Sequence, residues 1–311
     1  MFYDSMFDDR YGAPGLYSIY RCKRCGFGRT DPVLEKEKIG KFYKRYYPLS
    51  VLSPSDVKKL AKVVPMFLAW AWGIDNTAHR HVGKDRDVLD IGSGSGTSLL
   101  EIEKVGSRGF GVEPDPNAQK IAKQLMLDVF EGFITDNPFP EKKFDYITGS
   151  QVIEHEPDPL RFLKSAKKKL KNGGQIILSF PNFDSVYRKI FGRRWLNWHI
   201  PYHINFFTGS SFEKLAKNAG LKIIKRRAIT PNVWTLMQIR SLLISAKEGQ
   251  KNPIWTSTTL RGDIWDSSFS LKNFILQSIS TVFYILITPI NRFIDSLGVG
   301  DSLFVILENE Q

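Results

Sequence analysis

The sequence has only two cysteines among 311 residues, which excludes a fold held together by a network of disulfide bonds. The N-terminus lacks a basic segment followed by an apolar run and a cleavage site, so we expect no secretory signal and a cytoplasmic protein. Long apolar stretches are also scarce. Residues 274–290 carry no charge, but this segment is near the lower length limit for a membrane span and is interrupted by Gln277, Ser278 and Pro289.

The charge is unbalanced toward the positive side. Lys and Arg total 44 against 32 Asp and Glu, a formal net charge of +12. Such an excess favours an anionic partner, namely a phosphorylated substrate, a nucleic acid or an acidic membrane surface, without choosing among them. The densest basic run, residues 164–171, is interpreted as a solvated helix face, so a nucleic acid is not the expected partner.

Strand and helix signals alternate from residue 87 onward, which is typical of a parallel sheet covered by helices. Apolar strand-like runs and helical stretches follow one another at residues 87–91, 97–105, 109–112, 117–127, 144–148, 159–170 and 175–180. The sequence around this core suggests an appendage at 1–50, a helical linker at 51–86, the core at 87–232, a helical insertion at 233–299 and a final core strand at 300–311. Within the linker, residues 53–72 are expected to form one helix.

A glycine loop follows the first of these strands and precedes a helix. Glycines there permit a tight turn and let a ligand approach the backbone, while the helix start offers free N–H groups. The spacing G-x-G-x-G of Gly92, Gly94 and Gly96 differs from the dinucleotide pattern G-x-G-x-x-G, which disfavours a nicotinamide oxidoreductase. Glu113 ends the second strand, where a carboxylate can accept hydrogen bonds from both hydroxyls of a ribose.

Residues 88–96 resemble motif I of the class I S-adenosylmethionine-dependent methyltransferases, and residues 144–147, 152–159 and 170–178 resemble later motifs in the same order. The resemblance implies S-adenosylmethionine as cofactor and a Rossmann-like sheet of seven strands, the last of them, residues 302–307, antiparallel to the rest. Where the family commonly has an acidic residue after Gly132, this chain has Phe133 and Ile134, so apolar packing of adenine is expected. The cofactor-binding residues implied are Asp90, Gly92, Ser93, Gly94, Gly96, Glu113, Pro114, Phe133, Ile134, Ser150 and Gln151.

Methyl transfer needs the acceptor aligned with the methyl group, and a base when the acceptor is a hydroxyl or a protonated amine. The candidate bases are His155, His199 and His203. His155 follows the fourth strand, although the pair Glu154 and His155 would serve equally to cap the next helix. Residues 195–208 resemble the substrate side of the same methyltransferase subgroup, which implies acceptor binding by its aromatic residues; a packed loop is the alternative. The substrate-binding candidates are Trp195, Trp198 and Tyr202.

Both ends of the chain carry features outside this core. Cys22 and Cys25 are half of a thiolate zinc site, and their surroundings resemble the end of a zinc ribbon that precedes some methyltransferase domains. No metal is expected unless a further cysteine pair precedes them. Near the C-terminus, residues 271–297 place apolar side chains at helical steps, which fits a helix packed on the domain, an interfacial membrane helix or a dimer contact.

The hypothesis is therefore a class I methyltransferase acting on a small molecule or a sugar, including a glycan carried on a lipid. Peripheral contact with the inner face of a membrane through residues 271–297 would suit such a glycan. The alternatives are an RNA or protein methyltransferase, suggested by the charge, and a non-catalytic scaffold that binds S-adenosylmethionine.

Overall fold

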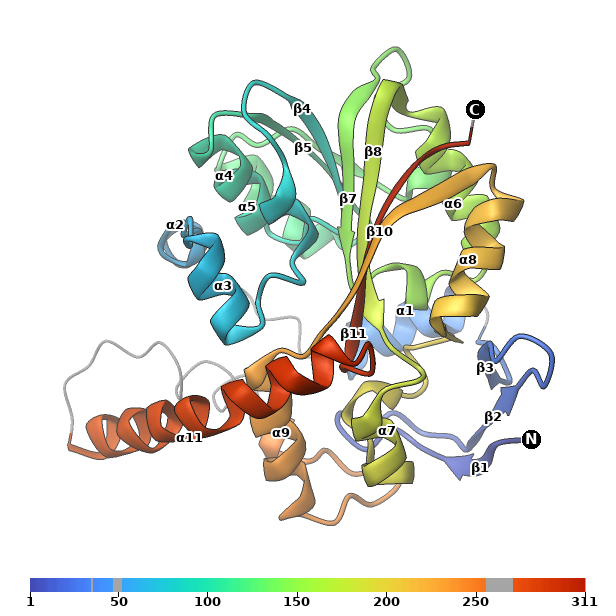
Figure 1. Ribbon diagram of the computed structural model, residues 1–311, viewed down its shortest axis with the longest axis vertical. Helices are drawn as coiled ribbons and strands as arrows, with labels where there is room; N and C mark the ends of the chain where they lie inside the picture. The colour runs from blue at the N-terminus through green and yellow to red at the C-terminus, as the bar shows by residue number, and fades with distance from the viewer. Residues whose placement is uncertain (35, 47–51, 256–270, 311) are drawn as a thin grey trace.

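The computed structural model describes residues 1–34, 36–46, 52–255 and 271–310 (Figure 1). Its centre is a seven-stranded sheet with the order β10-β11-β8-β7-β4-β5-β6. The strands are β4 (Asp87–Ile91), β5 (Arg108–Glu113), β6 (Val129–Glu131), β7 (Phe144–Ser150), β8 (Leu170–Pro181), β10 (Leu221–Ile229) and β11 (Ser302–Asn309). Only β11 runs against its neighbours β8 and β10, so the predicted sheet with an antiparallel last strand is confirmed.

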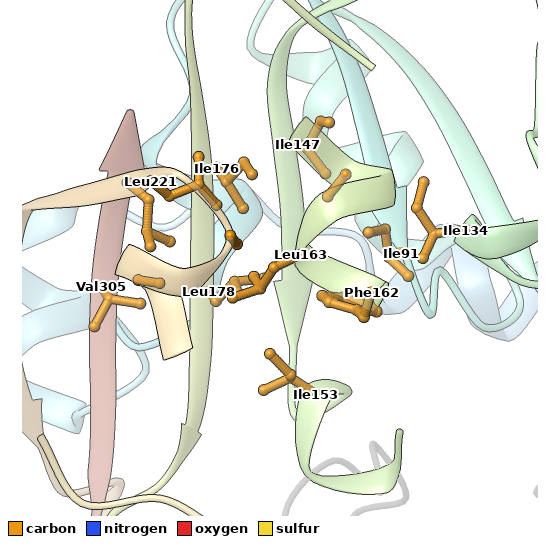
Figure 2. Packing of buried hydrophobic residues seen from close by; sticks show 14 of the residues in the cluster. Ile91, Ile134, Ile147, Ile153, Phe162, Leu163, Ile176, Leu178, Leu221 and Val305 are labelled. Atoms are coloured by element: carbon orange, nitrogen blue, oxygen red, sulfur yellow. The ribbon is translucent and has the colours of Figure 1, made fainter. Parts of the chain in front are cut away.

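Helices cover the sheet, and each helix buries one of its own faces. They are α4 (Thr97–Lys104), α5 (Pro116–Gln124), α6 (Pro159–Lys168) and α8 (Gly209–Asn218), with short 3-10 turns at η2 (Ile134–Asp136) and η3 (Ile153–His155). Figure 2 shows Phe162 and Leu163 of α6 gathered with Ile147 and Leu178 of the sheet in the main core. Full burial of each such side chain stabilises the fold by about 1.5–3 kcal/mol. Asp158 caps α6 by accepting the Arg161 N–H at 2.9 Å.

A second, antiparallel sheet has the order β1-β2-β3-β9 and joins the N-terminal appendage to the core. Its strands are β1 (Tyr3–Met6), β2 (Tyr17–Arg21), β3 (Gly28–Asp31) and β9 (Asn205–Phe206), and it is followed in the chain by α1 (Lys36–Arg45). Because β9 belongs to residues 195–208, the appendage is hydrogen-bonded to the segment expected on the substrate side. An aromatic core between them includes Tyr11, Tyr17, Phe42, Phe183, Trp195, Trp198, Tyr202 and Phe206.

The helix expected over residues 53–72 is in fact two helices, α2 (Pro54–Leu60) and α3 (Met66–Trp72). Pro65 occupies the N-cap of α3, and a proline both lacks an N–H and disfavours helical backbone in the residue before it. Ser53 and Asp56 begin α2 with a capping box, as the Ser-Pro start predicts.

The remaining helical elements gather at the edge of the main sheet where β7 and β8 end, together with the small sheet (Figure 1). They are η1 (Ala78–His81), α7 (Val186–Phe191), η4 (Gly192–Arg194), η5 (Leu196–Trp198), α9 (Asn232–Leu242), η6 (Pro253–Trp255) and α11 (Leu271–Ser296). None of the helices within the described ranges is both long enough and apolar enough to cross a membrane. Parallel sheets bind ligands at this edge, so these elements surround the place where the site is expected.

Candidate active site

The glycine loop connects β4 to α4 at the carboxyl edge of the sheet. Gly92 and Gly96 have positive φ angles of 73° and 92°, a region that suits glycine. A Cβ atom at Gly92 would lie 2.7 Å from Val152 Cγ2, and one at Gly96 would lie 2.3 Å from Leu127 Cδ1. Gly94 is different, because a Cβ there would meet nothing within 4 Å. The outer glycines therefore allow close packing, and the middle one leaves room for a ligand.

Glu113 ends β5 and reaches the glycine loop. Its Oε2 accepts the Gly94 N–H and its Oε1 accepts the Asp115 N–H, both at 2.9 Å. Burial raises the pKa of the Glu113 carboxyl, against the lowering effect of these two bonds. A carboxylate oxygen can accept more than one hydrogen bond. Glu113 can thus hold the loop and still accept both hydroxyls of a ribose.

Asp90 and Ser93 place polar groups beside the same loop. Thr148 donates its hydroxyl to Asp90 Oδ1 at 2.6 Å, and burial raises the pKa of the Asp90 carboxyl. The buried Ser93 hydroxyl has no hydrogen-bond partner within the described part of the chain. Buried hydroxyls are usually paired, and this one lies against Gly111 without a partner in the described ranges. The Asp90 carboxylate and the Ser93 hydroxyl fit the ammonium and carboxylate ends of S-adenosylmethionine.

The other residues predicted to contact the cofactor differ in how exposed they are and in which groups they bond. Ile134 is buried in the main core with Ile91 and Phe162, so it offers no surface to adenine, whereas Phe133 is half-buried. The Ser150 hydroxyl accepts the Ala78 N–H of η1 at 2.9 Å. The family resemblance placed residues 133 and 134 near adenine, but it could not say which of the two faces the core.

Pro114 and Gln151 flank the loop region at the ends of β5 and β7. Pro114 is exposed. Gln151 has a positive φ of 57° and donates its backbone N–H to the Ser179 carbonyl at 2.8 Å. The chain therefore turns sharply after β7, immediately before the segment that carries His155.

The three candidate bases lie together, although the sequence separates His155 from His199 and His203. The rings of His155 and His203 are 4.7 Å apart, and those of His199 and His203 are 4.8 Å apart. His155 Nδ1 lies 2.9 Å from the Tyr202 carbonyl oxygen and 3.1 Å from the Tyr43 hydroxyl of α1. Burial lowers the pKa of His155 to about 4 and holds the pKa values of His199 and His203 well below their usual range, so all three rings are neutral at pH 7.

Glu154 is a member of this cluster that the sequence prediction treated only as a cap. Its side chain is 0% exposed, and neither carboxyl oxygen has a hydrogen-bond partner among the residues the structure describes. His203 Nε2 lies 4.0 Å from Glu154 Oε1. Burial raises the pKa of Glu154 to about 8. Since Asp158 caps the following helix, the capping role considered for Glu154 and His155 is wrong.

Trp195 and Trp198, predicted to contact the acceptor, are only 0% and 2% exposed, and Tyr202 is buried with them. Trp195 Nε1 donates to Asp301 Oδ1 at 2.7 Å, and Trp198 Nε1 donates to the Gly192 carbonyl at 2.8 Å. The N-terminal sheet covers these rings, which the sequence did not reveal. They hold in place the segment that carries His199 and His203, and they present no free face to an acceptor.

Cys22 and Cys25 lie in the turn between β2 and β3, which the Gly26 N–H closes by donating to the Cys22 carbonyl at 2.9 Å. Both thiols are free, and a hydrogen bond from the Cys25 backbone lowers the pKa of Cys22. The single cluster of potential metal ligands in the described ranges is the one around Glu154, and it contains neither cysteine.

Comparison with known proteins matches residues 66–226 to a family profile described as a methyltransferase domain. The ubiquinone biosynthesis O-methyltransferase of Cupriavidus pinatubonensis is 25% identical over 204 residues, which cover 60% of this chain and 78% of that protein. An uncharacterised protein of Methanocaldococcus jannaschii is 29% identical over 146 residues, covering 47% and 69% respectively. Among solved structures, a chain from the complex of the Haloferax volcanii Trm112 methyltransferase activator with a methyltransferase has a TM-score of 0.49 and 17% identity, covering 83% of this chain and 94% of that chain.

Proposed function

The chain belongs to the methyltransferase-domain family and is an S-adenosylmethionine-dependent methyltransferase of class I, and we propose that it methylates a hydroxyl group of a small, partly apolar molecule. The observation that carries this proposal is the cluster of the half-buried His155 with the buried His199 and His203, near the end of β7. Neutral imidazoles can accept the proton that a hydroxyl loses when it is methylated. The similarity to O-methyltransferases of ubiquinone biosynthesis supports an oxygen acceptor with an apolar part.

In this proposal the cofactor binds at the glycine loop. Glu113 would accept the ribose hydroxyls, while Asp90, Ser93 and Gly94 would hold the methionine end. Bound S-adenosylmethionine supplies a methyl group carried by a sulfonium. The protein therefore has to exclude water, align the acceptor oxygen and receive one proton.

The proton would be received by the histidine cluster. His203 Nδ1 lies 2.8 Å from the Asn197 carbonyl oxygen, which can only accept, so Nε2 carries the lone pair. The Glu154 carboxyl lies beside that nitrogen, with its Oε1 4.0 Å from His203 Nε2. Trp195 and Trp198 are positioning residues here, because they hold the segment without touching the acceptor.

We propose that α11 and α3 contact the surface of an anionic membrane, from a cytoplasmic location. The polar side of α11 faces the protein, where Asn291 and Arg292 are buried and hydrogen-bonded. Its apolar side is exposed at Val282, Ile285, Leu286, Ile290 and Phe293, and Leu297, directly after the helix, is exposed as well. Phe67 and Trp70 are exposed on α3, which contacts α11.

This arrangement reverses the usual one, in which a surface helix buries its apolar side. A lipid surface fits the exposed side because an interfacial helix inserts apolar side chains among headgroups, and the net charge of +12 favours anionic lipids. The same surface would bring the active site close to an acceptor that partitions into the membrane.

The proposed chemistry can be tested with paired acceptors. Alkyl-substituted phenols and the matching anilines are incubated with the protein and methyl-labelled S-adenosylmethionine, and the products are identified by mass spectrometry. We expect methyl ethers of the phenols, lost in Glu113→Ala and reduced in His203→Ala. Methylation of the anilines alone would contradict an oxygen acceptor. A lipid-linked glycan, an RNA or a protein as the methyl acceptor remain the competing predictions.

A further inference from the structure

We propose that Glu154, His155 and His203 form a binding site for a divalent transition-metal ion such as Zn²⁺, Co²⁺ or Fe²⁺. One ligand atom from each of the three side chains lies within 4.8 Å of the others. Two imidazoles and one carboxylate are a donor set that suits these ions, and three protein ligands leave a coordination position open for a substrate. The net charge, the cofactor motifs and the family similarity do not assign this site.

The strongest support is the unpaired carboxyl of Glu154. Both of its oxygens are buried without a hydrogen-bond donor in the described part of the chain. Leaving a buried polar group unpaired costs about 1–3 kcal/mol, and more when the group is charged. A cation between Glu154 and the two rings would supply the missing partner. The unpaired carboxyl of Glu154 therefore favours binding of an ion, whereas a carboxyl that already had hydrogen-bond donors would not.

The histidine hydrogen bonds select the tautomer that metal binding requires. His155 Nδ1 lies 2.9 Å from the Tyr202 carbonyl oxygen, and His203 Nδ1 lies 2.8 Å from that of Asn197. A carbonyl only accepts, so each Nδ1 carries the proton and each Nε2 keeps its lone pair. Metal-binding histidines are usually held in this way, by an N–H donated to a backbone carbonyl.

The ligands sit on two segments that are tied together by the backbone. The Ile204 N–H donates to the Glu154 carbonyl at 2.8 Å, and Asn205 Nδ2 donates to the Glu156 carbonyl at 2.7 Å. Metal–ligand bonds of about 2.0–2.2 Å require ligand atoms roughly 3–3.5 Å apart. The 4.0 Å between His203 Nε2 and Glu154 Oε1 must therefore shorten by less than about 1 Å, while the ion replaces the 3.4 Å contact between His199 Nδ1 and His203 Nε2.

The role of the ion rests on the proposed function, whereas its binding does not. A hydroxyl coordinated to the open position would lose its proton to water, and the resulting oxygen anion would attack the sulfonium methyl, leaving a methyl ether and a neutral thioether. The ion would then replace direct proton acceptance by His155 and His203. One carboxylate and one oxygen anion balance a divalent cation, so the loaded buried site is neutral.

The test measures metal binding directly. The full chain with Cys22→Ser and Cys25→Ser is stripped with a chelator and titrated with Co²⁺, so that thiolates cannot produce the visible spectrum. We expect one equivalent of Co²⁺ with ligand-field bands of nitrogen and oxygen coordination, and at least tenfold weaker binding in Glu154→Gln and His203→Ala. Glu156→Gln, which removes the charge of a neighbouring carboxylate outside the cluster, is the matched control and should bind as before.

Folding of each variant is checked by S-adenosylhomocysteine binding, which depends on the glycine loop and not on the cluster. Absence of stoichiometric Co²⁺ binding by the folded double-serine chain, or unchanged binding in Glu154→Gln, would overturn the inference. Metal binding without methyl transfer to any hydroxyl would leave the site standing and defeat the proposed function. Methyl transfer by the metal-free protein at the full rate would leave the proposed function standing and overturn the catalytic role given to the ion.

Discussion

Glu113 shows at the scale of one residue how the proposed cofactor site is built. The same carboxylate holds the Gly94 and Asp115 N–H groups and faces the place where the ribose is expected. Because a hydrogen bond to a charged group contributes about 1.5–3 kcal/mol, losing the ribose contacts should weaken cofactor binding by tenfold or more. We expect this loss in Glu113→Ala when S-adenosylhomocysteine binding is measured by calorimetry.

The control for that prediction is Glu103→Ala, which removes an exposed carboxylate of α4 and should leave the affinity unchanged. Equal affinities of the Glu113→Ala variant and the unmodified protein would show that Glu113 only shapes the loop.

Asp301 gives a prediction for the pH dependence of stability. It accepts hydrogen bonds from Ser185, Trp195 and Asn197, yet burial raises its pKa to about 6, with the nearby Asp295 adding to the rise. The folded protein therefore holds this proton more tightly than the unfolded chain. Its contribution to stability is complete below about pH 4 and is lost as the pH rises through 6, a decrease of up to about 3 kcal/mol.

Asp301→Asn cannot titrate at this position. The free energy of unfolding of the unmodified protein should thus fall relative to that of Asp301→Asn between pH 4 and pH 7, as measured by urea denaturation at each pH. Parallel pH profiles would contradict the assignment.

The residues of the cofactor loop could be predicted from the sequence because a strand, a glycine turn and a helix are local features. Glu113 is also local, since it ends the next strand. The burial of Trp195 and Trp198 could not be predicted, because it depends on a sheet formed by residues about 180 positions earlier in the chain. The isolation of the Glu154 carboxyl depends on the same long-range packing.

At the scale of whole elements, α11 has its polar side turned inward. Asn291 is 0% exposed and donates to Asn232 at 2.8 Å and to Thr235 at 3.1 Å, whereas the adjacent Ile290 is 52% exposed. We expect Asn291→Ala to lower the free energy of unfolding by about 1–3 kcal/mol because buried partners lose their bonds. Ile290→Ala should change it by no more than about 0.5 kcal/mol. Chemical denaturation compares the two, and a larger loss in Ile290→Ala would show that the apolar side is the packed one.

The exposed side of α11 gives the second prediction at this scale. Leu286 and Phe293 are each 65% exposed, so replacing both by Gln should leave the folding stability nearly unchanged. The double variant should bind anionic liposomes at least tenfold more weakly than the unmodified protein, because insertion of each side chain contributes about 1.5–3 kcal/mol. Sedimentation at low salt measures this. If the unmodified protein does not bind such liposomes, the membrane proposal fails.

Periodicity predicted most elements of the main sheet and its helices, but it joined α2 and α3 into one helix. The apolar positions continue through residues 57–68 at helical steps, while Pro65 interrupts the backbone. The same periodicity located α11 correctly and could not say which side faces the protein, since that depends on the buried polar partners of Asn291 and Arg292.

For the molecule as a whole, the N-terminal appendage packs against the segment that carries the histidine cluster. Pairing of β3 with β9, and the proximity of Tyr43 to His155, connect the appendage to the histidine cluster. The glycine loop is the proposed binding site of the methyl donor, and the appendage with residues 195–208 surrounds the place where the acceptor is expected. The predicted boundaries at 50, 86, 232 and 299 remain predictions, although the pairing of β3 with β9 crosses the first two of them.

The most direct test of this account is to follow the methyl group itself. The protein is incubated with methyl-labelled S-adenosylmethionine and a cell extract that is then divided into organic-extractable small molecules, water-soluble small molecules, RNA and protein. We predict that label enters an organic-extractable molecule through a new methyl ether, and that it does not do so with Glu113→Ala. Label confined to RNA or protein, or no transfer to any fraction by a protein that binds S-adenosylmethionine, would contradict the account.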